Sequence, residues 1–141
     1  IAEHGPGSHE LALLYLDVDH FQEINDHLGH AVGDEVLKVF ASRLQRSVRT
    51  SDVVARLGGD EFVILLQHLS SSEHASEVAA KVIEAMTEPL QIRQYSLAVS
   101  TSIGVAMLDA QTPCPETLLE KADQALYQAK QAGRNRFSLA P

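Results

Sequence analysis

The sequence predicts one α/β domain in which helices cover a central mixed, largely antiparallel sheet. An apolar run from Leu11 to Leu16 is typical of a strand that is buried on both faces. Two more apolar stretches, 53–57 and 62–66, are separated by two glycines and two acids, which is the pattern of a β-hairpin. Segments with helical spacing lie between these strands and after them. This mixture favours a partly antiparallel sheet over a doubly wound parallel one.

The first predicted helix follows the first strand and runs from Asp34 to about Arg49. Its apolar residues recur every three or four positions, so one face can pack on the sheet. These residues are Val36, Leu37, Phe40, Leu44 and Val48. After the hairpin, Ser70 and Glu73 have the spacing of a capping box, and a second helix is expected to follow them and to end before Pro89.

The last third of the chain predicts two strands, a helix and a short final strand. Strands are expected at 90–95 and at 97–107, where apolar residues alternate with others. A proline-containing loop then leads to a helix whose apolar face is mainly leucine and alanine, with Gly133 as the residue just beyond its C-terminal end. A short strand at 136–139 is expected to follow.

Composition limits the classes of partner. The 141 residues are 45% hydrophobic and 21% charged, as in a folded domain with its own core. A net charge of −8 argues against a nucleic-acid-binding surface, which needs cations to neutralise phosphates. A small phosphorylated ligand is compatible with this charge, because carboxylates can bind it through a metal ion. No apolar run is long enough to insert the domain into a membrane.

The start of the chain and its single cysteine indicate its context. The chain begins at Ile1 without a signal segment, so we expect part of a longer protein, with residues 1–10 as a tail or linker and residues 11–141 as the domain. Cys114 is alone and cannot form an internal disulfide, which is typical of a reducing compartment. The expected location is therefore cytoplasmic, whether or not the parent protein is anchored in a membrane.

Acidic residues cluster at two points that a sheet could bring together. Asp17 and Asp19 end the first strand, and Asp60 and Glu61 lie at the tip of the hairpin. If those strands are neighbours, their carboxylates converge, and carboxylate oxygens are ligands that Mg²⁺ takes together with water and phosphates. Two metal ions held in this way can organise phosphoryl transfer. The alternative is that acids and glycines simply occupy turns.

A polar segment after the first strand carries further candidates. Asn25 and Asp34 offer donors and acceptors that suit a guanine edge, although on spacing alone helix capping explains them better. His20, His27 and His30 are better explained as surface histidines than as a zinc site, because no cysteine or second histidine cluster accompanies them.

Two cations lie near the end of the last predicted helix. Lys130 and Arg134 flank Gly133, where positive charge stabilises the helix dipole. A phosphorylated ligand bound nearby would supply an anion that the same cations could contact.

Three blocks of the sequence match one family in order and spacing. The block at the hairpin contains Gly-Gly-Asp-Glu-Phe at 58–62, an earlier block spans 16–34, and a third spans 122–135. From about Leu11 to Phe137 the chain therefore resembles the GGDEF domains, the catalytic domains of bacterial diguanylate cyclases. The resemblance implies a palm-like fold similar to that of nucleotide cyclases and polymerases. It also implies a reaction that joins two GTP molecules into cyclic di-GMP with release of two pyrophosphates.

A metal site is a further implication of the resemblance. Asp17, the backbone carbonyl of Val18 and Asp60 would hold Mg²⁺, with Mn²⁺ able to substitute. Glu61 would support a second metal ion or help to deprotonate the attacking 3′-hydroxyl. Asp60 and Glu61 are therefore the expected catalytic residues.

The same resemblance implies a binding site for GTP. The guanine base would be read by Asn25 and Asp34. The outer phosphates would contact Lys130 and Arg134, which neutralise charge on the pyrophosphate leaving group. The expected substrate-binding residues are His20, Phe21, Gln22, Asn25, His30, Asp34, Lys130 and Arg134.

Assembly and regulation also follow from the resemblance. Each domain of the family binds one GTP, so catalysis implies a homodimer, controlled by an upstream sensory or regulatory domain. Arg49 and Asp52 form the Arg-x-x-Asp pattern that the family carries five residues before the double glycine, where bound cyclic di-GMP inhibits the enzyme. The alternative for this pair is an ion pair at the end of a helix.

Two departures from the family bear on activity. Gln22 stands where the family often has lysine, which removes a cation near the phosphates. The customary Asp-x-Leu-Thr-x-Leu-x-Asn-Arg segment before the first strand is missing from this chain. The alternatives to an active cyclase are a catalytically weak module that binds GTP or cyclic di-GMP to regulate an attached domain, and a dimerisation scaffold. The retained acids of the hairpin favour the enzyme.

Overall fold

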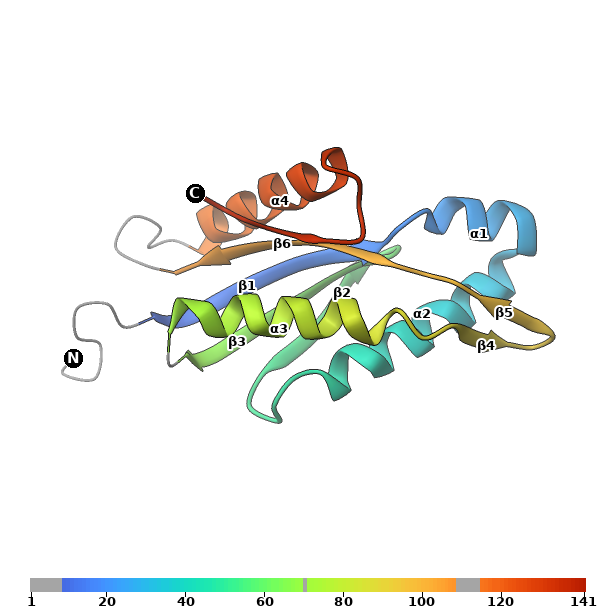
Figure 1. Ribbon diagram of the computed structural model, residues 1–141, viewed down its shortest axis with the longest axis horizontal. Coiled ribbons are helices and arrows are strands. Elements are labelled where there is room, and N and C mark those ends of the chain that lie inside the picture. Colours follow the sequence, from blue (N-terminus) through green and yellow to red (C-terminus); the bar gives the residue numbers. More distant parts are fainter. Residues whose placement is uncertain (1–8, 70, 109–114) are drawn as a thin grey trace.

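The computed structural model describes residues 9–69, 71–108 and 115–141. Five strands form one sheet in the order β2-β3-β1-β6-β7, and β4 and β5 form a separate hairpin (Figure 1). The elements are β1 (His9–Val18), α1 (Phe21–Leu28), α2 (His30–Arg46), β2 (Val53–Gly58), β3 (Glu61–Leu69), α3 (Ser72–Ala85), β4 (Leu90–Ile92), β5 (Tyr95–Leu97), β6 (Thr101–Met107), α4 (Pro115–Gln131) and β7 (Phe137–Leu139). Cys114 and most of the expected N-terminal tail lie outside the described residues.

β1 lies at the centre of the sheet, between β3 and β6. Both neighbours run antiparallel to it, and the register pairs Asp17 with Glu61 on β3 and with Ser102 on β6. Leu14 on one face of β1 and Leu13 on the other are both buried and belong to different cores, as predicted for a strand covered on both faces. The edge strand β7 runs parallel to β6. The predicted fold class, a mixed and largely antiparallel sheet with helices around it, is confirmed.

Helices cover both faces of this sheet (Figure 1). On one face, Phe40 of α2 and Val82 of α3 share a core with Phe62 of β3, and the two phenylalanine rings lie 5.1 Å apart. On the other face, Ala122 of α4 belongs to a second core with Ala106 of β6. Removal of this apolar surface from water is the main force that holds the helices on the sheet.

The helical prediction for the first half of the chain needs correction. α2 begins at His30 and ends at Arg46, whereas the expected helix ran from Asp34 to about Arg49. A separate helix, α1, precedes it, and Gly29 with φ 92° divides the two. Phe21, Ile24 and Leu28 have helical spacing and form an apolar stripe that packs, partly buried, against the core. The other residues of α1 are polar, and this is why the segment was predicted only as a polar stretch after the first strand.

Two strand predictions also change. The expected strand at 90–95 is the β4–β5 hairpin, which turns at Arg93 with φ 55°. Leu97 belongs to β5, and β6 starts only at Thr101. The hairpin carries no glycine or asparagine at its turn, so the usual signal for two strands is absent from the sequence.

The structure tests the predicted start of α3 and the predicted end of α4. Ser71 caps α3 without a side-chain hydrogen bond, and Ser70, the expected capping residue, lies outside the described residues. Gly133 terminates α4 as predicted, because its N–H donates to the Lys130 carbonyl and the Arg134 N–H donates to the Ala129 carbonyl. None of the described helices combines the length and apolar character needed to cross a membrane.

Candidate active site

The fold brings the two acidic clusters to one end of the sheet. Asp17 pairs with Glu61 across β1 and β3, and Gly58 pairs with Glu61 across the hairpin, so Asp60 lies in the turn beside the end of β1. Gly58 and Gly59 have φ values of 149° and 52°, which glycine adopts without steric cost. The turn therefore depends on the two glycines that precede the acids.

A cavity of about 360 Å³ lies where these elements meet. It is lined by acids from β1 and the hairpin, by the start of α1 and by cations from the end of α4. The lining residues are Asp17, Val18, Asp19, His20, Phe21, Gln22, Asp60, Glu61, Lys130 and Arg134. The structure thus gathers, from three separate segments of the chain, most of the site residues that the sequence predicts.

Asp17 is the most buried acid of the predicted metal set, at 6% exposure. Its Oδ2 accepts a hydrogen bond from Lys130 Nζ at 2.5 Å, whereas its Oδ1 is buried without a hydrogen-bond partner. Burial raises the pKa of Asp17, the Lys130 ammonium opposes that rise, and the charges of Asp60 and Asp19 add to it. A divalent cation at this point would satisfy the free oxygen and relieve the repulsion.

Asp60 shares this electrostatic environment. Burial raises its pKa, backbone N–H groups and Lys130 oppose the rise, and the Glu61 carboxylate contributes to it. Within the described part of the chain, no three carboxylate, histidine or cysteine side chains form a metal cluster by themselves. Two carboxylates and the Val18 carbonyl fit Mg²⁺, which keeps several water or phosphate ligands. The donor set therefore suits a site completed by substrate.

The raised pKa of Asp60 predicts a stability effect in the metal-free protein. The folded carboxyl binds its proton more tightly than the unfolded one, so stability falls as the pH rises above 3.8 and through the higher folded value. Asp60→Asn removes the charge, and we expect a melting temperature about 1–3 °C higher at pH 7.5 in EDTA, with little gain near pH 3.5. The exposed acid of α4, changed in Glu120→Gln, is the control. A lower melting temperature for Asp60→Asn at pH 7.5 would contradict this electrostatic description.

From the sequence, the Asp19 carboxylate was expected to converge with that of Asp17 at a metal site, and the structure corrects this. Its carboxylate lines the cavity but is occupied by hydrogen bonds from Ser100 Oγ at 2.6 Å, Ser102 Oγ at 2.7 Å and the Asn135 N–H at 3.1 Å. Because both carboxylate oxygens already have donors, Asp19 has no free oxygen of the kind that Asp17 offers.

The start of α1 lines the cavity through His20, Phe21 and Gln22. His20 precedes the helix in a left-handed conformation with φ 59°, and its Nδ1 lies 3.3 Å from Glu23 Oε1. Gln22 donates from Nε2 to Asp26 Oδ1 at 2.9 Å. The residue that replaces the family's lysine is thus held by its own helix.

The predicted guanine-reading residues lie near a second cavity. Asp34, on α2, lines a hollow of about 470 Å³ together with Arg56 and Phe62 of the hairpin. Asn25, on α1, packs against α2 so closely that a Cβ at Gly33 would lie 1.9 Å from its Oδ1. His30 is exposed at the first position of α2. The hairpin contributes residues to both cavities, and neither set of lining residues includes Asn25 or His30.

Comparison with known proteins identifies the family. The sequence model of the family described as "Diguanylate cyclase, GGDEF domain" matches residues 1–136. The chain belongs to the GGDEF family. It is 44% identical over 132 residues to diguanylate cyclase TpbB of Pseudomonas aeruginosa, which covers 93% of this chain and 30% of TpbB. It is 42% identical to diguanylate cyclase DosC of Escherichia coli, covering 92% of this chain and 28% of DosC.

Solved structures agree with this assignment. The crystal structure of the GGDEF domain of PA1120 (YfiN or TpbB) from Pseudomonas aeruginosa superimposes with a TM-score of 0.91 at 43% identity, covering 94% of this chain and 83% of that one. The GGDEF domain therefore has the palm-like fold that its sequence predicts. It spans about a third of the length of the curated relatives TpbB and DosC.

Tyr15 is a residue of this GGDEF domain that sequence reasoning missed. Its hydroxyl donates to Glu61 Oε1 at 3.1 Å. Burial and the neighbouring carboxylates of Glu61, Asp123 and Asp17 raise the pKa of Tyr15 to about 12, so the hydroxyl keeps its proton. A signal was present, because residues two apart in a strand share a face and Tyr15 precedes Asp17 by two.

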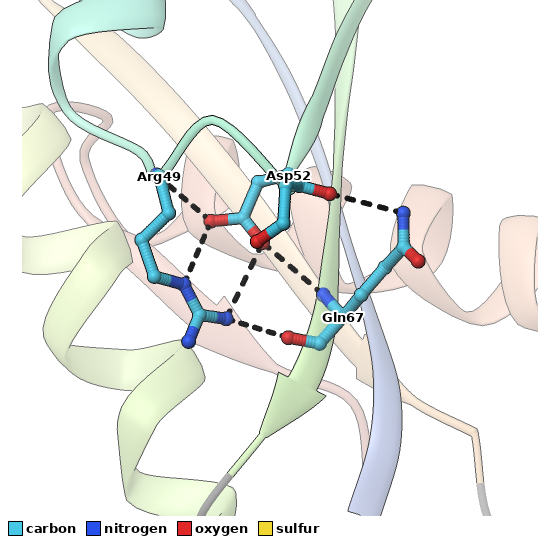
Figure 2. Close-up of polar contacts among 4 residues, drawn as sticks. Arg49, Asp52 and Gln67 are labelled. Carbon is cyan, nitrogen blue, oxygen red and sulfur yellow. Dashed lines mark hydrogen bonds and ion pairs between the residues drawn. The ribbon is translucent and has the colours of Figure 1, made fainter.

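The Arg-x-x-Asp pair forms a closed cluster with β3 (Figure 2). Asp52 is buried and accepts from the Arg49 N–H at 3.0 Å, from Arg49 Nε at 3.3 Å and from the Gln67 N–H at 3.2 Å. Arg49 also donates to the Gln67 carbonyl at 2.5 Å. Although burial works to raise it, these hydrogen bonds hold the pKa of Asp52 below its usual range. Arg49 and Asp52 therefore form an ion pair that joins the loop between α2 and β2 to β3, with the arginine side chain half exposed.

Proposed function

We propose that this GGDEF domain is a diguanylate cyclase that condenses two GTP molecules into cyclic di-GMP and two pyrophosphates with the aid of Mg²⁺ or Mn²⁺. One observation carries the proposal. A single cavity combines a buried Asp17 oxygen that lacks a partner, the two hairpin acids and the cations Lys130 and Arg134. This combination suits a metal ion on one side and a polyphosphate on the other.

In the proposed mechanism, the site residues divide the work of phosphoryl transfer. Asp17, Asp60 and the Val18 carbonyl would hold the metal ion, which supplies charge stabilisation to the phosphates when bound. Glu61, exposed at the start of β3, would take the proton of the 3′-hydroxyl while Tyr15 orients its carboxylate. The new bond joins the 3′-oxygen to the α-phosphorus, and the bond to pyrophosphate breaks. Lys130 and Arg134 would neutralise the departing pyrophosphate.

Assembly into a homodimer is part of the proposal. If each domain binds one GTP in this cavity, as the family resemblance implies, the attacking hydroxyl would come from a nucleotide on a second domain. We expect cyclic di-GMP formation to rise with more than the first power of protein concentration when the domain is incubated with GTP and Mg²⁺. A rate per domain that is constant over a hundredfold range of concentration would contradict dimer-dependent catalysis.

The guanine site gives a sharper test through Gly33. Alanine at this position is a better helix former by up to about 1 kcal/mol, so the fold should tolerate Gly33→Ala. Its Cβ would displace the Asn25 amide, which lies 1.9 Å away, and we expect GTP affinity to fall by about 10-fold or more. Calorimetric titration of Gly33→Ala, Asn25→Ala and the double variant measures this effect. If both substitutions act through the Asn25 amide, the double variant binds GTP no more weakly than Asn25→Ala alone. Additive losses of affinity would contradict this.

We also propose that cyclic di-GMP inhibits the enzyme by binding at Arg49 and Asp52. A cavity of about 260 Å³ beside the pair is also lined by Lys81 and His74, which could face an anionic ligand. We expect Arg49→Ala to raise the concentration of cyclic di-GMP needed for half-inhibition by at least about 10-fold while the uninhibited rate is kept. Arg93→Ala removes another exposed arginine from an ion pair and is the matched control. Half-inhibition of Arg49→Ala at the same cyclic di-GMP concentration as wild type would contradict an inhibitory site at Arg49.

The second candidate function is a module that binds GTP or cyclic di-GMP without turnover. Gln22 favours it, because the position lacks a cation and its side chain is tied to Asp26. One relative at 40% identity is named for a different activity, the cyclic di-GMP phosphodiesterase NbdA of Pseudomonas aeruginosa. Tight GTP binding without product would select this function. In either case we propose that the domain works in the cytoplasm, under the control of a sensory or regulatory domain in a longer protein.

A further inference from the structure

Asp19 is a buried carboxylate that joins three segments of the chain. It lies at the end of β1 with 5% exposure. Its Oδ1 accepts from Ser102 Oγ of β6, and its Oδ2 accepts from Ser100 Oγ before β6 and from the Asn135 N–H after α4. The Asp19 N–H also donates to the Ser100 carbonyl at 2.9 Å. A buried anion is stable only when it is satisfied in this way, so the three donors and Asp19 hold one another in place.

The segment that Asp19 holds has a strained backbone. Gly133, Arg134 and Asn135 have successive φ values of 126°, 65° and 51°. Glycine and asparagine accept a positive φ readily, but arginine does not, so this conformation of Arg134 persists only because its surroundings impose it. The hydrogen bonds at the end of α4 fix Arg134 from one side, and the bond from the Asn135 N–H to Asp19 fixes the next residue from the other.

We propose that Asp19 is a positioning residue that fixes the backbone at Arg134 and Asn135 and thereby directs the Arg134 side chain to the cavity of Asp17 and Lys130. This inference rests on the proposed function, in which Arg134 contacts the outer phosphates of GTP. A carboxylate suits this position because it is an acceptor only and can serve three donors at once. An asparagine has a single acceptor oxygen and would leave at least one of the donors poorly satisfied.

The test separates positioning of Arg134 from a general loss of stability. Asp19→Asn, Arg134→Ala and the double variant are titrated with GTP in the presence of Mg²⁺ and with guanosine, which lacks phosphates. We expect Asp19→Asn to weaken GTP binding by about 10-fold, with guanosine binding changed less than about twofold. In the Arg134→Ala background the same substitution should have an effect below about twofold, because the group that it positions is gone.

Two outcomes would overturn the inference. Equal losses of GTP affinity in both backgrounds would mean that Asp19 does not act through Arg134. Equal losses for GTP and guanosine would mean a general structural effect. If Asp19→Asn does not fold, Ser100→Ala removes one donor at the edge of the network and takes its place in the same cycle.

Hydrogen exchange distinguishes failure of this inference from failure of the proposed function. If the wild-type domain binds no GTP, the proposed function fails, and the Asn135 amide of the free protein then decides the inference. Faster exchange of that amide in Asp19→Asn, by at least about 10-fold while the core of β1 stays protected, supports the positioning role. Unchanged exchange overturns it.

Discussion

Replacement of Asp60 by alanine is expected to lower cyclic di-GMP formation by at least about 1000-fold while the domain stays folded. The substitution removes one of two carboxylates of the proposed metal site, and the other, Asp17, is already paired with Lys130 through one oxygen. The loss should exceed that of any change to the phosphate-binding cations, because it removes the metal ion and the charge stabilisation that it supplies.

The measurement for Asp60→Ala is chromatographic resolution of nucleotide products after incubation with GTP and Mg²⁺. Glu120→Ala removes an exposed carboxylate from α4 away from the cavity and should keep the wild-type rate. Circular dichroism shows whether each variant is folded. Activity of Asp60→Ala within about 10-fold of wild type would mean that the hairpin acid is not a metal ligand in catalysis.

Replacement of Gly104 by alanine is expected to have the largest effect on stability, about 3–5 kcal/mol. Gly104 lies in β6 directly under α4, and an added Cβ would lie 2.0 Å from the Ala122 carbonyl oxygen and 2.3 Å from the Leu126 nitrogen. Both atoms belong to the helix backbone, which cannot move aside as a flexible side chain could. α4, which carries Lys130, would therefore have to shift away from the sheet.

Urea denaturation followed by circular dichroism measures this loss. Ser138→Ala changes the residue that pairs with Gly104 on β7, and it should stay within about 1 kcal/mol of wild type. A loss below about 1 kcal/mol for Gly104→Ala would show that α4 packs on the sheet less closely than described.

The parts of the fold that the sequence predicted are those with a local signal. The continuous apolar run of β1, the two glycines of the hairpin and the glycine after α4 each determine a local conformation. α1 was missed because it is short and mostly polar, although Phe21, Ile24 and Leu28 give it a helical apolar stripe. The β4–β5 hairpin was missed because its turn uses Arg93 with φ 55°, so that tertiary contacts outweigh local preference there.

The site was predictable to the extent that strand order could be inferred. Once β1 and β3 are neighbours, Asp17 and the hairpin acids must meet. The role of Asp19 was not predictable, because its donors Ser100 and Asn135 lie 81 and 116 positions away along the chain. Local sequence cannot distinguish a carboxylate that faces a metal ion from one that is already satisfied by such distant groups.

Crystal diffraction with Mn²⁺ and a non-hydrolysable GTP analogue tests the central claim most directly, because the anomalous signal locates the metal. The account predicts a peak about 2.1 Å from Asp17 Oδ1, from the Val18 carbonyl oxygen and from an Asp60 oxygen, with phosphates on the side of Lys130 and Arg134. A peak at His20 or His27, or a triphosphate bound without metal at the Asp17 oxygen, would contradict it.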